Sequence, residues 1–406
     1  MNYYLNTYSF SDQLLDAVVP TDLAMVVVIP CFNEPNLINS LQSLYRCQKT
    51  KGKVEVITVI NAPEDAGEEV LKQNAKTRKE AEEWATTHPK EGISFHFIQE
   101  DQLPTKDAGV GLARKIGMDE AVRRLEQVGN SKGIIVCFDA DATCDANYLV
   151  AIEDHFNQHP NTPGCSIHFE HPLSGNDYPE YIYKGIEEYE LHLRYYKNGL
   201  KFCGLPYAYH TIGSSMAVRS NVYQKQNGMN KRKAGEDFYF LQKIIPLGNF
   251  TEINTTKVIP SPRTSDRVPF GTGKAMQNYV DNQLQEHTSY HPQSFLDLQQ
   301  FCETVPQLYS SDEWNVPDSV SGYLKEINIQ GNLEKIRKNS TSQEHFVQLF
   351  YHWFNAFRVL KYMHYARDHF YPDVSVFEAA NELLGWLGLE KQPKEQLIYF
   401  YRELDR

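Results

Sequence analysis

The sequence predicts an α/β fold with a mostly parallel sheet flanked by helices, followed by a mainly helical C-terminal domain or extension. In the first 260 residues, short β-branched apolar runs alternate with longer polar or amphipathic segments. This alternation is typical of a sheet whose strands are joined by crossover helices. After about residue 277 the apolar and aromatic residues recur at helical spacing, and no further β-branched run occurs.

The individual elements follow from these runs. Strands are expected at 25–29, 54–60, 93–98 and 133–138, and residues 165–169 and 256–259 could extend the sheet. Helices are expected at 36–46, 66–86, 108–128 and 147–157. Right-handed crossovers would make these strands parallel. The helix at 66–86 is highly charged with a thin apolar stripe, so we expect it to lie on the solvent-exposed surface.

The change in character suggests two domains. We place the boundary near residue 280, which gives a catalytic α/β domain at 1–280 and a helical accessory domain at 281–406. Residues 346–360 form a strongly apolar helix pattern that we interpret as the core of the accessory domain. A peripheral contact with a membrane surface or a partner helix stays open, although basic residues are sparse there.

Charge and cysteine content narrow the class of protein. Lys and Arg number 40 against 52 Asp and Glu, giving a net charge of −12 that argues against a nucleic-acid-binding protein. Seven scattered cysteines without C-x-x-C spacing indicate reduced thiols. The N-terminus shows no signal-peptide pattern, and no apolar run is long enough for a transmembrane segment. We therefore expect a cytoplasmic protein.

Two carboxylates end the apolar run at 133–138, namely Asp139 and Asp141. In open α/β sheets, ligands bind just beyond the carboxyl ends of the strands. Neighbouring acids repel each other unless a cation lies between them, and Mg²⁺ or Mn²⁺ prefers such oxygen ligands. The pair therefore suggests a divalent metal site. The alternative is an Asp-rich turn that caps the next helix.

A second polar loop follows the first predicted strand. There, Pro30 ends the strand, and Asn33 and Glu34 precede a helix beginning near residue 35. Backbone N–H groups and these two side chains would face the same sheet edge as the acid pair. An ordinary strand–turn–helix, with Pro and Asn as the turn residues, would explain the same pattern.

Two further motifs open predicted helices. Gly109 and Gly111 precede Arg114, an arrangement suited to an anionic diphosphate, although close packing of a helix on the sheet explains the glycines as well. Glu236 and Asp237 open an amphipathic helix later in the chain. Helix capping accounts for one acid there but less naturally for two.

Together these motifs resemble the family 2 glycosyltransferases, which have the Rossmann-like GT-A fold of nucleotide-diphospho-sugar transferases. The resemblance covers residues 25–245. It rests on Ile29-Pro30-Cys-Phe-Asn33-Glu34, Gly109-x-Gly111-x-Ala113-Arg114, Asp139-Ala-Asp141, Gly213-Ser214-Ser-Met-Ala-Val-Arg219 and Gly235-Glu236-Asp237. It implies a hexosyltransferase-like enzyme that moves a sugar from a nucleotide diphosphate to a hydroxyl, with inversion at the anomeric carbon.

The resemblance also implies roles for the acids. Asp141 would bind the divalent metal, Mg²⁺ or Mn²⁺, and Asp139 would help to hold the metal or the ribose. The metal would neutralise the departing diphosphate. Asp237 would be the general base that accepts the proton of the acceptor hydroxyl, and Glu236 beside it could raise its pKa.

The remaining roles concern the two substrates. The donor, a UDP- or GDP-sugar, would be bound by Pro30, Asn33, Glu34, Gly109 and Arg114. A glycan or glycoconjugate acceptor would approach the backbone at Gly213 and Ser214. The second strand lacks the family's usual acidic pair and ends in Asn61 instead. An amide can still bond a base edge, so uridine and guanosine both stay open.

The loop at 260–274 departs further from the family. Many relatives carry a metal-binding histidine 20–30 residues beyond the Glu-Asp pair, but no histidine occurs here between His210 and His287. Asp266 could supply the missing ligand, while Arg263 and Arg267 could clamp the diphosphate. The alternative is an ordinary Pro/Gly-rich connection with solvated charges.

Two alternatives to this function stay open. A sugar nucleotidyltransferase would favour a loop rich in Gly, Lys and Arg after the first strand, whereas this loop is Pro-Cys-Phe-Asn-Glu-Pro. A catalytically degenerate module for nucleotide-sugar binding or assembly would not need the intact acids Asp139, Asp141, Glu236 and Asp237. The donor sugar, the acceptor and the linkage cannot be predicted from these residues.

Overall fold

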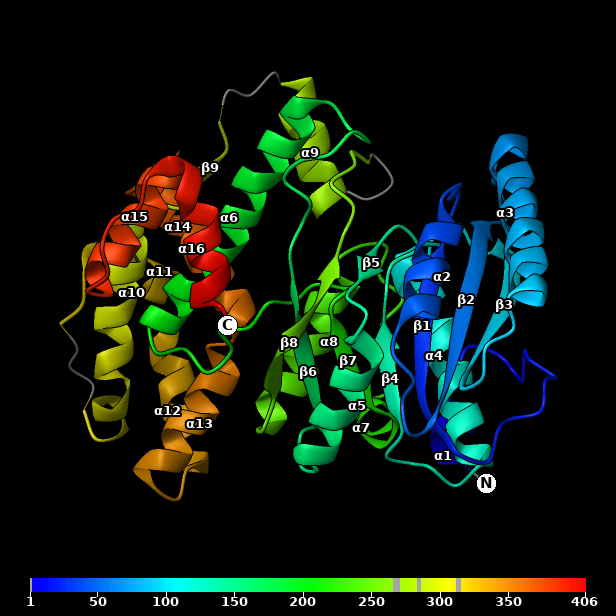
Figure 1. The fold of residues 1–406 in the computed structure, drawn as a ribbon. Helices are drawn as coiled ribbons and strands as arrows, with labels where there is room; N and C mark the ends of the chain where they lie inside the picture. The colour runs from blue at the N-terminus through cyan, green and yellow to red at the C-terminus, as the bar shows by residue number, and fades with distance from the viewer. Residues whose placement is uncertain (1, 266–270, 283–285, 312–314) are drawn as a thin grey trace. The chain divides into compact units, whose positions relative to one another are not determined.

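A computed structural model describes residues 2–265, 271–282, 286–311 and 315–406 (Figure 1). The chain divides into two compact units. The first contains Met1–Tyr178 and Thr211–Gln277, and the second contains Pro179–His210 and Asn278–Arg406. The helical unit thus includes a segment from the middle of the sequence, which a single division at residue 280 does not anticipate.

The first unit is built on one sheet, which has eight strands among the described residues, in the order β3-β2-β1-β4-β7-β6-β8-β5. Their bounds are β1 Leu23–Cys31, β2 Lys53–Pro63, β3 Ile93–Leu103, β4 Ile134–Cys137, β5 Thr143–Cys144, β6 Gly164–Phe169, β7 Met216–Arg219 and β8 Thr251–Ile259. Strands β1 to β4 pair in parallel, as do β6 and β8. The sequence missed β7, which has only four residues and lies antiparallel to β4 and β6.

Helices cover the parallel strands in this unit (Figure 1). They are α2 Leu37–Arg46, α3 Glu68–Thr87, α4 Val110–Gln127 and α5 Tyr148–Gln158, joined by the shorter α1 Tyr3–Thr7, α7 Ser220–Lys225 and α8 Glu236–Ile244. The expectation that residues 66–86 form a solvent-exposed helix is only half right. One side of α3 is exposed, but Trp84 is 9% exposed and packs edge-on against Phe95 of β3.

Helix α4 lies directly against β1 and β2. A Cβ atom on Gly117 would lie 2.4 Å from Val28 Cγ1, so the helix can approach β1 this closely only without a side chain there. Arg124 forms a fully buried bidentate pair with Glu55 of β2, with Nε–Oε2 2.5 Å and Nη2–Oε1 2.7 Å. These contacts fix the helix that carries Gly109 and Arg114 at its N-terminal end.

The second unit is mainly helical. Its described helices are α6 Glu180–Phe202, α10 Pro292–Thr304, α11 Asp318–Glu326, α12 Ile329–Asn339, α13 Gln343–Trp353, α14 Ala356–His369, α15 Val376–Trp386 and α16 Lys394–Leu404; α9 Thr272–Asp281 spans the division between the units. Strands β9 Thr288–Ser289 and β10 Val374–Ser375 pair antiparallel. The predicted single helix at 346–360 is two helices, because Asn355 ends the run and caps α14 through its side chain. Among the described residues, no helix is long and apolar enough to cross a membrane.

Buried ion pairs hold α16 to α6 within this unit. Arg402 Nε lies 2.7 Å from Glu190 Oε1, and Arg194 Nη1 lies 2.6 Å from Asp405 Oδ2. All four side chains are buried. Each buried guanidinium is paired with a buried carboxylate, so no charge in this cluster is left without a counter-ion.

Candidate active site

Two neighbouring parallel strands, β1 and β4, bring together two of the predicted site residues, Glu34 and Asp141. Val28 of β1 pairs with Cys137 of β4, so the loops after both strands leave the same edge of the sheet. Glu34 follows β1 and is almost completely buried, while Asp141 follows β4 and is partly exposed. The sequence prediction that these two loops share one edge is therefore correct for the described structure.

Arg263 joins the two loops. Its Nη1 lies 2.5 Å from Glu34 Oε2, and its Nε lies 2.7 Å from Asp141 Oδ2. Burial raises the pKa of Asp141 to about 6, although the charge of Arg263 opposes that shift. The predicted Arg263 thus lies at the site, and it binds carboxylates of the chain itself. Asp266 and Arg267 lie outside the described residues.

A second arginine joins the acid pair to α8. Arg114 is 3% exposed and forms ion pairs with Asp139 through Nη2 and with Glu236 through Nη1. Burial alone would lower the pKa of Arg114, but the charges of Asp139 and Glu236 raise it, so the guanidinium stays charged. Residues from three separate motifs therefore meet in one buried ion-pair cluster.

The acids of α8 begin the helix, where the backbone N–H groups favour negative charge. Burial raises the pKa of Glu236 to about 7 even though Arg114 lowers it. Burial also raises the pKa of Asp237, whose side chain is partly exposed. Asp237 Oδ1 accepts a hydrogen bond of 2.7 Å from the N–H of Phe238. Of the two acids, Asp237 is the one that an incoming molecule can reach.

Gly213 has a packing role that the amino-acid sequence alone does not reveal. A Cβ atom there would lie 2.3 Å from Arg114 Nη1, so the glycine makes room for the guanidinium. Ser214 is 1% exposed, and its hydroxyl lies 3.4 Å from that of Ser215. Acceptor binding at these two residues stays a prediction, and the packing of Arg114 explains the glycine without it.

The glycines that open α4 also make room for backbone. A Cβ atom on Gly111 would lie 2.3 Å from the carbonyl oxygen of Arg232, and one on Gly109 would lie 2.9 Å from Lys233 Cα. The segment before α8 therefore crosses the start of α4. This contact favours the packing interpretation of the Gly-x-Gly pattern over a diphosphate-binding turn.

The sequence did not identify two residues of α3 that support the loop after β1 and the end of β2. Asn74 Oδ1 accepts a hydrogen bond of 2.9 Å from the N–H of Asn33, and its Nδ2 donates one of 3.0 Å to the carbonyl oxygen of Asn61. Thr77 donates one of 2.8 Å to the carbonyl oxygen of Glu34. Asn74 and Thr77 both lie on the buried side of α3. Polar residues at these buried helix positions are the sequence feature that could have identified them. The two side chains connect the loop after β1 with the end of β2. Pro30, predicted to end the first strand, lies within β1, which continues to Cys31.

The donor atoms at this edge suit a hard divalent cation. Among the described residues, two guanidinium groups, those of Arg114 and Arg263, interact with the five carboxylates of Glu34, Asp139, Asp141, Glu236 and Asp237. The excess of acidic oxygen fits Mg²⁺ or Mn²⁺. However, the described ranges contain no group of three His, Cys, Asp or Glu side chains arranged to hold a metal ion. Asp139 and Asp141 are therefore a partial ligand set.

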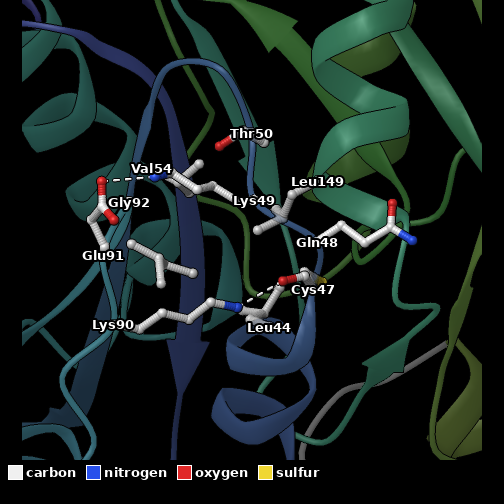
Figure 2. Close-up of a pocket in the computed structure, with 11 residues that line it drawn as sticks. Leu44, Cys47, Gln48, Lys49, Thr50, Val54, Lys90, Glu91, Gly92 and Leu149 are labelled. Atoms are coloured by element: carbon white, nitrogen blue, oxygen red, sulfur yellow. Dashed lines mark hydrogen bonds and ion pairs between the residues drawn. The ribbon is translucent and has the colours of Figure 1, made fainter.

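The surface pocket in Figure 2 is a different feature. It is lined by the first residues of β2 and β3, such as Val54 and Ile93, and by Cys47 and Lys90. The predicted site residues follow the carboxyl ends of the strands, and none of them lines this pocket.

The parallel strands and the acids that follow them match the α/β fold with a mostly parallel sheet that the sequence predicts. The model of the family described as Glycosyl transferase family 2 matches residues 26–225, and this part of the chain is similar to that family. The match begins within β1, contains Arg114, the Asp-x-Asp pair and Gly213, and ends before α8.

Two solved structures show weak similarity to the chain. S. aureus TarS 1–349 in complex with UDP-GlcNAc is 13% identical with a TM-score of 0.38, over 94% of this chain and 88% of that one. The mannosyltransferase PcManGT from Pyrobaculum calidifontis, in complex with GDP-Man and Mn²⁺, is 13% identical with a TM-score of 0.38, over 87% of this chain and 94% of that one. No curated protein matches the chain significantly in sequence.

Proposed function

We propose that this protein is an inverting, hexosyltransferase-like glycosyltransferase that uses a UDP- or GDP-sugar donor and a hydroxyl of a glycan or glycoconjugate as acceptor. One observation carries the proposal. Arg114 links Asp139, at the donor edge of the sheet, to Glu236, which stands directly before Asp237. A donor-binding acid and a candidate base are thus held in one cluster.

Asp237 acts as the general base. In a single in-line displacement its carboxylate takes the proton of the acceptor hydroxyl while that oxygen bonds to the anomeric carbon. The bond between this carbon and the diphosphate oxygen breaks on the opposite side, so the configuration inverts. The raised pKa of Asp237 makes it a stronger base than an ordinary aspartate.

Charge on the departing diphosphate needs compensation. Asp141 and Asp139 would hold Mg²⁺ or Mn²⁺, which when bound supplies positive charge to the diphosphate. Asp266 as a further ligand and Arg267 as a clamp stay predictions, because they lie outside the described residues. Arg263 lies at the same carboxyl edge of the sheet. It would bind the diphosphate once the carboxylates that it now contacts bind the cation instead.

Donor recognition involves the loops after β1 and β2. Pro30, Asn33 and Asn61 would face the nucleotide. The backbone of Asn33 and Asn61 is held by hydrogen bonds with the Asn74 side chain. Arg114 was expected to approach the diphosphate. Because its guanidinium is buried between two carboxylates, we assign it a positioning role instead.

A binding screen tests the donor class. Thermal unfolding would be followed with UDP, GDP and their sugars, each with and without Mn²⁺. A ligand that binds only the folded state raises the midpoint according to its concentration and Kd, so the strongest shift identifies the nucleotide. Release of nucleotide diphosphate in the presence of acceptor would establish transfer. Binding without any release would favour the degenerate binding module, and release of pyrophosphate from a sugar phosphate and UTP or GTP would favour the nucleotidyltransferase.

A further inference from the structure

Two cysteines outside the active site lie in contact. The sulfur atoms of Cys47 and Cys144 are 3.7 Å apart. Cys47 directly follows α2, and Cys144 is the second residue of β5. A disulfide bond of about 2.05 Å would therefore require the two sulfurs to approach by roughly 1.7 Å. Side-chain rotation and a small backbone adjustment can supply a shift of that size.

The two thiols differ in their tendency to ionise. The hydrogen bond from Cys144 is the main cause that lowers the pKa of Cys47, and the charge of Lys90 and the N–H groups at the start of α5 act in the same direction. Lys90 Nζ also donates a hydrogen bond of 2.7 Å to the carbonyl oxygen of Cys47 (Figure 2). The same contact raises the pKa of Cys144. Of the two thiols, Cys47 therefore ionises more readily and is the better candidate for the attacking sulfur.

Both sulfurs have a route to solvent. Cys47 is 3% exposed but lines the pocket of Figure 2. Cys144 is partly exposed and lines a second surface pocket together with Ser43 and Arg46. The other five cysteines are buried as well, but none of them lines either pocket: Cys31, Cys137, Cys165, Cys203 and Cys302. A small oxidant can therefore approach this pair through the two pockets.

We propose that Cys47 and Cys144 are a redox-active pair that forms a reversible disulfide when a hydroperoxide oxidises Cys47. The Cys47 thiolate attacks one peroxide oxygen, the O–O bond breaks, and Cys47 becomes a sulfenic acid while the released hydroxide takes up a proton as water. The sulfur of Cys144 then attacks the sulfur of Cys47. The S–O bond breaks, and a second water leaves with the proton of Cys144. In total the two thiols lose two electrons and two protons, hydrogen peroxide becomes two waters, and a dithiol reductant reverses the change.

The bond would connect two segments that lead away from the active site. Helix α2 begins three residues after Glu34, and β5 begins two residues after Asp141. A disulfide would therefore restrain the two loops that Arg263 joins. The redox chemistry itself does not depend on the proposed transfer reaction, so the two proposals can fail separately.

The test uses the full chain treated with a small excess of hydrogen peroxide, followed by thiol counting in denaturant. The wild type should lose two of its seven thiols, and the intact mass should fall by about 2 Da. Proteolysis should release one linked pair of peptides, containing Cys47 and Cys144, and dithiothreitol should restore all the thiols. As a control, Cys302→Ser should still lose two thiols.

The variant Cys144→Ser distinguishes a specific disulfide between Cys47 and Cys144 from general oxidation of the thiols. This variant keeps Cys47 and should form no disulfide, so the Cys47 sulfenic acid should accumulate and be trapped by dimedone. The readout needs no activity, and it does not depend on a Cys47 variant that could fold poorly. The proposal is overturned if the wild type keeps all seven thiols, if a different pair such as Cys203 and Cys302 is linked, or if only intermolecular disulfides form.

Discussion

Arg263 and Asp141 form an ion pair in which Nε lies 2.7 Å from Oδ2. The second acid of the Asp-x-Asp pair, the residue expected to bind the metal, is thus held by a guanidinium. The other nitrogen contact of Arg263, with Glu34, connects the same guanidinium to the loop after β1. Arg263 therefore competes for the carboxylates that would bind a cation at this edge.

Arg263→Gln should tighten the binding of Mn²⁺ in the absence of nucleotide. The substitution removes one positive charge and frees two carboxylates, and we expect roughly a fivefold lower Kd, or on the order of 1 kcal/mol. Titration calorimetry with Mn²⁺ alone measures this directly. Arg78→Gln is the matched control, because in the described structure Arg78 pairs with Glu82 of α3 and Gln99 of β3 and with neither Glu34 nor Asp141. Unchanged or weaker Mn²⁺ binding by Arg263→Gln would show that the ion pair does not compete with the metal.

Arg114→Gln should shift the pH dependence of transfer. The charge of Arg114 lowers the pKa of both Glu236 and Asp237, so its removal should raise both values. Because the base must be deprotonated, the acidic limb of the kcat profile should move to higher pH by about one unit. Arg114→Lys keeps the charge and should restore the limb. A lower kcat with an unmoved acidic limb in Arg114→Gln would indicate a structural role only.

Gly213→Ala should destabilise the protein and disturb the Arg114 cluster. The added Cβ would lie 2.3 Å from the guanidinium, and overpacking of this kind costs about 1–3 kcal/mol. Denaturant unfolding should report the loss, with kcat reduced at the same time. Gly67→Ala is the control, since nothing lies within 4 Å of its Cβ position, and it should change the free energy of unfolding by less than about 1 kcal/mol. Equal effects of the two substitutions would contradict the packing role.

Glu55→Gln should reduce stability more than any of the substitutions at the sheet edge. It leaves the buried guanidinium of Arg124 without its counter-ion, and breaking such a pair costs about 3–5 kcal/mol. Burial raises the pKa of Glu55, but the hydrogen bonds from Arg124 outweigh this and lower it below its ordinary value of 4.5. The contribution is therefore present above pH 4.5 and is lost as the pH falls through the lower folded-state pKa. Unfolding curves at pH 7 and pH 4 should show the difference between wild type and variant shrinking at the lower pH.

The sequence located the elements of the sheet better than the contacts of the site. Strands β1, β2 and β4 were predicted because their apolar runs are buried on both sides of the sheet. Strand β3 lies at the edge of the sheet and is mostly half-buried, but its first residues still alternate apolar side chains. Strand β7 was missed because four residues are too few to predict a strand. It forms through its pairing with β4 and β6, which are distant in the sequence.

Arg114 shows why the rest of the site could not be predicted. An arginine in the first turns of a helix is usually solvated, and only the approach of Gly213 and α8 encloses this one. In the same way, the Gly-x-Gly pattern is compatible with a phosphate-binding turn until the segment at Arg232 is seen to cross it. Long-range packing therefore decided between alternatives that the local sequence left open.

The most direct test of the proposed mechanism compares wild type with Asp237→Asn. With the donor identified by thermal shift, release of nucleotide diphosphate in the presence of acceptor would be measured together with the Kd for the nucleotide. Loss of the general base should lower kcat by about 10²–10⁴-fold, while the Kd stays within about twofold of the wild-type value. Turnover near the wild-type rate in Asp237→Asn would contradict the assignment of Asp237 as the base on which the proposed transfer depends.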